Sequence, residues 1–141
     1  MDRYWFFTWR TYGTWLPGAG SFVGFYRDPS GESRIDNRNG EPASEAMAPL
    51  ADYAGDLLVH EPTFLTPEAA GVVLLELLRT CRHRGWQPDA VAVLRDHVHF
   101  VFGVPGDPEP EDLLREIKSY TSRALNRAFG RKRWWVVGGS T

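Results

Sequence analysis

Hydrophobic positions along the chain recur with two periods, one typical of strands and one typical of helices. Residues 4–12 are rich in aromatic and β-branched side chains and follow no helix cap, which predicts a strand inside a sheet. Two further apolar runs, residues 90–94 and 98–104, have only a short polar stretch between them, so we expect adjacent strands. A last apolar run, residues 134–137, predicts a terminal strand.

Two other segments have the spacing of amphipathic helices. Thr66 suits the N-cap of the first helix, Pro67 its first helical position, and Gly85 its C-terminal stop. Three arginines suit its last turn, where cations complement the helix dipole: Arg79, Arg82 and Arg84. The second helix is predicted from about Pro110 to Phe129, with apolar residues at helical intervals.

The predicted order is therefore strand, helix, strand, strand, helix, strand. This order is that of an α+β, ferredoxin-like fold (β-α-β-β-α-β), in which one antiparallel sheet carries both helices on one face. Residues 18–48 are rich in glycine and proline, and we expect a long loop insertion there, with a short ordered piece around residues 22–26. The 141 residues are predicted to form one domain, 1–141.

The composition is that of an ordinary water-soluble protein. No apolar run approaches the roughly 20 residues that cross a bilayer, and the first residues lack a secretory pattern. The only cysteine, Cys81, permits no internal disulfide. We therefore expect a cytoplasmic protein without a membrane partner.

The net charge of −2 is unevenly distributed. Cationic residues gather along the second helix and just after it, and local basic stripes of this kind bind phosphate. The candidate DNA-binding residues are Arg115, Lys118, Arg123, Arg127, Arg131, Lys132 and Arg133. The alternative interpretation is a solvated helix face.

A histidine pair, His97 and His99, lies on one of the predicted strands. Side chains alternate along a strand, so both imidazoles project from one face, about 6–7 Å apart at Cα, and can converge on one divalent ion. Imidazole suits Mn²⁺, Zn²⁺, Co²⁺ or Ni²⁺ better than Mg²⁺. Two histidines are too few for a structural zinc site, so the metal hypothesis is an open catalytic site, with Asp96 or a backbone carbonyl orienting a ligand. The alternative is a pair of ordinary hydrogen-bonded strand histidines.

Tyr120 falls at the edge of the apolar stripe of the second helix. Its ordinary interpretation is a half-buried packing residue with its hydroxyl in water. Its functional interpretation is a nucleophile that attacks phosphorus and forms a covalent intermediate. A free phenol has a pKa of about 10, so positive potential from Lys118, Arg123 or a metal would be needed. Tyr12, at the end of the first strand, is the competing tyrosine.

Taken together, several stretches in one order resemble the single-tyrosine HUH transposases, and most closely their REP-associated branch. The stretches are residues 11–18, 96–101, 118–126 and 135–141. The resemblance implies the ferredoxin-like fold and a divalent ion, Mg²⁺ or Mn²⁺, held by His97 and His99. It also implies that Tyr120 attacks single-stranded DNA, forming a 5′-phosphotyrosine and freeing a 3′-hydroxyl. Recognition of a DNA hairpin is implied too, as is a homodimer in which the tyrosine helix faces the partner's histidines.

One position departs from the family pattern. Similar transposases carry a polar third metal ligand four residues after the tyrosine, where this chain has Ala124. Asn126 is the possible substitute. The leading hypothesis is a metal-dependent single-stranded DNA endonuclease and strand transferase. The alternatives are a catalytically inactive DNA- or RNA-hairpin-binding module, and a metal-dependent nuclease that uses water in place of the tyrosine.

Overall fold

A computed structural model of the chain describes residues 1–14, 24–27, 33–36 and 61–139. The chain divides into two compact units, Met1–Tyr12 with Thr63–Thr141, and Gly13–Pro62. In the second unit β2 (Gly24–Arg27) pairs with β3 (Ser33–Asp36) in antiparallel fashion. Most of the predicted loop insertion, residues 18–48, lies outside the described residues, and the ordered piece expected around 22–26 overlaps β2.

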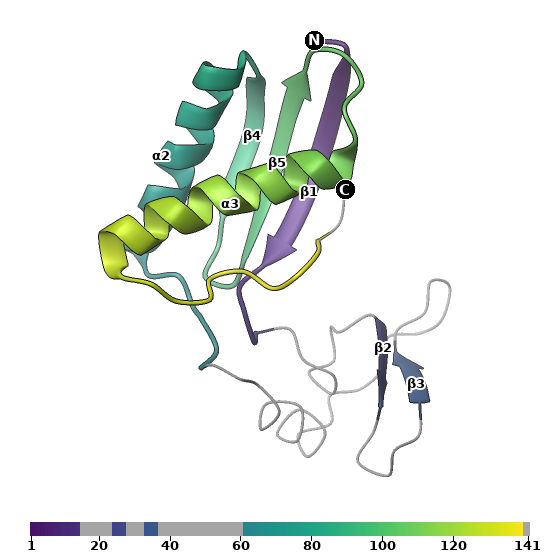
Figure 1. Ribbon diagram of the computed structural model, residues 1–141, viewed down its shortest axis with the longest axis vertical. Coiled ribbons are helices and arrows are strands. Elements are labelled where there is room, and N and C mark those ends of the chain that lie inside the picture. The colour runs from purple at the N-terminus through teal and green to yellow at the C-terminus, as the bar shows by residue number, and fades with distance from the viewer. Residues whose placement is uncertain (15–23, 28–32, 37–60, 140–141) are drawn as a thin grey trace. The chain divides into compact units, whose positions relative to one another are not determined.

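The first unit is built on a three-stranded antiparallel sheet of order β1-β5-β4. Its strands are β1 (Arg3–Arg10), β4 (Gln87–Val93) and β5 (His97–Val104), so the three predicted strands are confirmed with small shifts at their ends. β4 and β5 are consecutive and form the expected adjacent pair, while β1 lies along the other edge of β5 (Figure 1).

Two helices cover one face of this sheet (Figure 1). In α2 (Pro67–Arg84) the Thr66 hydroxyl accepts a hydrogen bond from the Ala69 N–H at 3.1 Å, and Gly85 ends the helix in the left-handed conformation at φ 69°. α3 spans Pro110–Phe129. Both predicted helices are confirmed. The caps of α2 and the apolar spacing of both helices are local signals. No helix among the described residues is long and apolar enough to cross a membrane.

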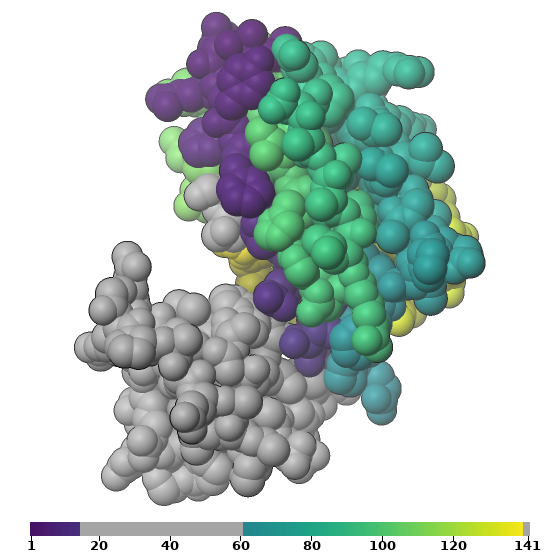
Figure 2. Space-filling view, turned by 180° about the vertical axis from the view of Figure 1, so that it is seen from behind, coloured from purple at the N-terminus to yellow at the C-terminus, as the bar shows by residue number. Residues whose placement is uncertain are grey.

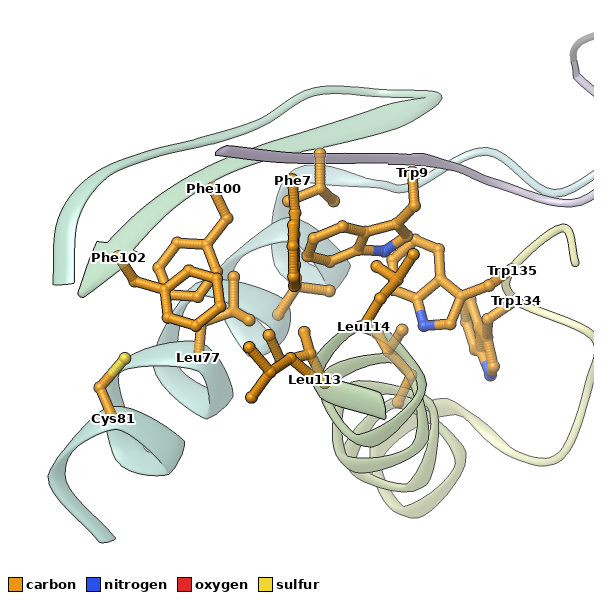
Figure 3. Close-up of a cluster of buried hydrophobic side chains, with 14 of the residues drawn as sticks. Phe7, Trp9, Leu77, Cys81, Phe100, Phe102, Leu113, Leu114, Trp134 and Trp135 are labelled. Atoms are coloured by element: carbon orange, nitrogen blue, oxygen red, sulfur yellow. The ribbon is translucent and has the colours of Figure 1, made fainter. Parts of the chain in front are cut away.

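The core lies between the helices and the inner face of the sheet. Phe7 and Trp9 of β1 and Phe100 and Phe102 of β5 are buried and point toward the helices (Figure 3). Residues at the alternate positions therefore project from the outer face, since successive side chains of a strand point to opposite sides. Figure 2 shows β1, β5 and β4 at the surface on this outer side.

The predicted terminal strand at residues 134–137 was wrong in part. Its only strand-like contact among the described residues is an isolated antiparallel bridge between Thr11 and Trp135, at the free edge of β1. Trp134 and Trp135 are consecutive and both buried, and α3 accepts a hydrogen bond from each indole N–H, at Asn126 and Thr121. A regular strand would send these two side chains to opposite faces. The described residues thus form an α+β unit without the complete ferredoxin-like order.

Candidate active site

The hairpin between β4 and β5 places the histidine pair. Leu94 N–H donates to the His97 carbonyl at 2.8 Å, which closes a tight connection and makes His97 the first residue of β5. His97 and His99 are half-buried on the outer face, with ring centroids 4.7 Å apart. The two imidazoles predicted to share a face do so.

Each imidazole uses its Nδ1 atom within the chain. His97 Nδ1 lies 2.7 Å from Asp96 Oδ1, and His99 Nδ1 lies 2.8 Å from the hydroxyl oxygen of Thr8 on β1. Because Nδ1 of each ring is engaged, Nε2 is the ring atom that could bind a ligand, as in metal sites whose histidines are oriented by a carboxylate or a backbone carbonyl. Such sites need the neutral imidazole.

The electrostatics of the pair follow from its neighbours. The hydrogen bond from His97, together with the charge of Arg10, lowers the pKa of the Asp96 carboxyl. Arg10 Nη1 lies 3.5 Å from Asp96 Oδ2. Burial lowers the pKa of His99, and the neighbouring His97 and Arg10 add to this shift. Asp96 therefore stays ionised, and burial favours the neutral form of His99.

Among the described residues, no group of three or more His, Cys, Asp or Glu side chains is arranged to bind a metal ion. Asn126, the predicted third ligand, lies on α3 on the helix side of the sheet. Its Oδ1 accepts from Trp134 Nε1 at 2.8 Å and from Lys132 N at 3.3 Å. The residues that could hold a metal are thus two oriented imidazoles, one ligand fewer than the three protein ligands typical of catalytic zinc sites.

Tyr120 lies on α3 beside the C-terminal end of α2. Its hydroxyl oxygen accepts a hydrogen bond from Arg84 Nη2 at 2.9 Å. The same Arg84 atom lies 2.7 Å from Glu116 Oε2. The Arg123 guanidinium lies 5.3 Å from the centre of the Tyr120 ring. The phenol is half-buried, and the guanidinium groups of Arg84 and Arg123 lie beside it.

Tyr120 and the histidine pair do not meet within one chain. The helices occupy the inner face of the sheet, and His97 and His99 project from the outer face.

A family model described as Transposase IS200 like matches residues 64–139, more than half of the chain. The chain belongs to the IS200-like transposase family. The matched segment contains α2, β4, β5 and α3, and with them His97, His99 and Tyr120. The resemblance to the single-tyrosine HUH transposases is thereby confirmed, and with it a transposase-type function that acts on and binds DNA. Comparison with curated proteins and with solved structures found no match.

The cationic residues of the transposase are not equally available to DNA. Lys118 donates to the carbonyl oxygens of Val136 and of Gly138, the latter at 2.6 Å, and burial lowers the pKa of this lysine. Arg115 is exposed and lies 2.5 Å from Asp112. The remaining predicted residues, Arg123, Arg127, Arg131, Lys132 and Arg133, are exposed.

A pocket of about 560 Å³ lies between the first half of α3 and the segment that follows Trp134. Leu114 and Trp135 contribute to its apolar lining, and Arg115, Lys118 and Arg133 contribute cations. Three of the predicted DNA-binding residues are therefore gathered around one concave surface of the transposase.

Two residues near the candidate site were missed in the sequence. Thr8 orients His99 only because β1 pairs with β5 in one register, which no local pattern reveals. Arg84 was interpreted as a residue complementary to the dipole of α2. Its proximity to Tyr120 depends on how α2 packs against α3.

Proposed function

We propose that this transposase is a metal-dependent single-stranded DNA endonuclease and strand transferase that acts through a 5′-phosphotyrosine intermediate. The observation that carries the proposal is the histidine pair, in which Asp96 and Thr8 engage both Nδ1 atoms and leave both Nε2 atoms for a ligand.

His97 and His99 would hold the divalent ion, Mg²⁺ or Mn²⁺, through Nε2. When bound, the ion polarises the scissile phosphate and offsets the charge that develops on its oxygens. Asp96 would keep the His97 ring in the tautomer that has Nε2 unprotonated. Asn126 is the proposed third ligand, although its oxygen already accepts two hydrogen bonds in its own chain.

Tyr120 would supply the nucleophile. Its phenolic oxygen attacks the scissile phosphorus, a bond between that oxygen and phosphorus forms, and the bond from phosphorus to the 3′ oxygen breaks. The phenolic proton leaves to solvent, and the departing oxygen takes up a proton to become a 3′-hydroxyl. A second transesterification by another 3′-hydroxyl joins strands and releases the tyrosine.

The separation of Tyr120 from His97 and His99 supports a homodimer as the active form. In one chain they lie on different faces of the sheet. An active site would therefore combine the tyrosine of one protomer with the histidine pair of its partner. The exposed cations on and after α3 would hold the phosphates of a hairpin and its single-stranded flank.

The test is a denaturing gel of hairpin DNA with randomised single-stranded flanks, labelled at its 3′ end and incubated with Mn²⁺. A 5′-phosphotyrosine leaves the labelled fragment attached to protein, so wild type is expected to give a slow band that proteinase removes. Tyr120→Phe and His97→Ala are expected to abolish the band, while Tyr12→Phe, the competing tyrosine, is the matched control and is expected to retain it.

Other outcomes separate the alternatives. An undiminished adduct in Tyr120→Phe removes this residue from the role of nucleophile. DNA cleavage that needs Mn²⁺ but survives Tyr120→Phe without an adduct identifies a nuclease that uses water.

A further inference from the structure

Arg84 connects the candidate nucleophile to a neighbouring helix. Its Nη2 atom donates to the Tyr120 hydroxyl oxygen at 2.9 Å and to Glu116 Oε2 at 2.7 Å. Glu116 and Tyr120 are one helical turn apart on α3, so both partners of the guanidinium come from one face of that helix. None of these three residues belongs to the buried core or to the candidate DNA-binding residues.

The backbone and the rings around Arg84 restrict where its guanidinium lies. Arg84 is the last residue of α2, and Gly85 in the left-handed conformation ends the helix directly after it. The guanidinium carbon lies 5.8 Å from the centres of the rings of Trp86 and Tyr120. The arginine is therefore held between two aromatic rings and a carboxylate while its N–H points to the phenol.

From this geometry we propose that Arg84 is a positioning residue for the nucleophile. It holds the Tyr120 oxygen in place for attack, and Glu116 orients the guanidinium. The inference rests on the proposed function of Tyr120. It goes beyond it by assigning a role to two residues that the histidine pair and the tyrosine do not imply.

The physical basis is the direction of the hydrogen bond. The phenolic oxygen accepts from a cation, and a charge-assisted hydrogen bond of this kind is stronger than one between neutral groups. Because Arg84 donates to the phenolic oxygen, the phenol's own proton points away from Arg84. Solvent can accept that proton. The Glu116 side chain is 39% exposed, so water screens its charge. Glu116 therefore orients the guanidinium of Arg84 without cancelling its positive charge.

Arg84 and Tyr120 lie on two helices of one protomer that pack against each other. One protomer therefore supplies both residues to a composite site. The tyrosine protomer would bring a phenol with its own cation, and the partner would bring the histidine pair. Neither half would then depend on the other to prepare its reactive group.

The test compares Arg84→Met with wild type in single-turnover adduct formation, with saturating hairpin DNA carrying randomised flanks and Mn²⁺. Methionine retains much of the apolar stem and removes every N–H donor. The first-turnover rate is expected to fall about ten- to hundredfold, the usual consequence of losing a charge-assisted hydrogen bond. DNA affinity is expected to change by less than about threefold. Arg84→Lys, which retains the cation, is expected to recover part of the rate.

Two further measurements separate positioning from a structural role. The first-turnover rate of Arg84→Met is expected to fall while its half-saturating DNA concentration stays close to the wild-type value, because the guanidinium acts on the phenol. Arg79→Met is the matched control, since Arg79 lies on the same helix and pairs with Glu76. It is expected to behave as wild type in both the first-turnover rate and the half-saturating DNA concentration.

The possible failures are distinguishable. Absence of a Tyr120-dependent adduct in wild type overturns the proposed function itself. A wild-type adduct with an unchanged rate in Arg84→Met overturns only the role of Arg84, as does a loss confined to DNA affinity. Should thermal unfolding show that Arg84→Met has lost its fold, Arg84→Gln takes its place, and an unchanged rate there overturns the inference.

Discussion

The Thr8 hydroxyl oxygen lies 2.8 Å from Nδ1 of His99, across the antiparallel pair formed by β1 and β5. This contact joins residues that are far apart in sequence and orients one half of the candidate metal site. Asp96 does the same for His97 from the adjacent position in the chain. The two histidines are therefore oriented by different kinds of contact, one local and one long-range.

Replacing Thr8 by valine is expected to weaken Mn²⁺ binding by about tenfold or more, because second-shell partners of metal-bound histidines typically contribute that much. The shape of the side chain is retained, so the fold should persist. Isothermal titration of the protein with Mn²⁺ measures the change. Thr80→Val, at a buried threonine on α2, is the control. Equal affinities in Thr8→Val and wild type would show that Thr8 does not orient a metal ligand.

Mixed dimers test the composite site directly. Neither Tyr120→Phe nor His97→Ala is expected to form a DNA adduct alone. Co-expressed, they form some heterodimers in which the intact tyrosine of one chain faces the intact histidine pair of the other. We expect the adduct to reappear on the His97→Ala chain, which a size tag identifies on the gel. An inactive mixture, with heterodimers shown to be present, contradicts a site shared between protomers.

Exposed cations that follow the tyrosine should contribute to DNA affinity through phosphate contacts. Arg127→Gln and Arg131→Gln are each expected to reduce the slope of log affinity against log salt by about 0.7–0.9, the contribution of one phosphate contact. Fluorescence anisotropy of a labelled hairpin at several salt concentrations measures the slope. Arg3→Gln is the control, since Arg3 pairs with Asp107 at 2.8 Å near the N-terminus. A slope unchanged in both variants would place the DNA elsewhere.

Asn126 offers a prediction that separates structure from metal binding. Its Oδ1 accepts from Trp134 Nε1 and from Lys132 N. Asn126→Ala should therefore lower the free energy of unfolding by about 1–3 kcal/mol without any metal, since it leaves a buried indole N–H unpaired. Urea denaturation in the presence of a chelator measures this. Unchanged metal-free stability together with lost Mn²⁺ affinity would instead identify Asn126 as a ligand.

Cys81 makes the stability of the protein sensitive to alkaline pH. The side chain is buried in the core, and burial raises the pKa of its thiol from 9.0 to about 11. Between these values the unfolded chain has lost the proton that the folded chain retains, so stability falls as the pH rises. The expected loss from this group is about 2–3 kcal/mol. Urea denaturation at pH 8 and about pH 11 measures it, with Cys81→Ala as the reference variant. Equal losses in wild type and Cys81→Ala would contradict the assignment.

The helices and most of the sheet were predictable because their signals are local. Thr66, Pro67 and Gly85 each affect only backbone groups within about one helical turn. Each has its predicted role in α2. The histidine pair was predictable for the same reason, since the alternation of a strand alone places both rings on one face. The terminal strand was not, because Trp134 and Trp135 pack against α3. That packing overrides the strand preference of an apolar run.

By itself, the sequence determined the secondary structure around the site, the shared face of His97 and His99, and the family to which the chain belongs. Tertiary structure alone decided which residues orient these groups, because Thr8 reaches His99 and Arg84 reaches Tyr120 only through the register of β1 with β5 and the packing of α2 on α3. It also decided that the tyrosine and the histidine pair lie apart in one chain. Local patterns specify the direction of a side chain from its own element, whereas the distance between two elements depends on the core that joins them.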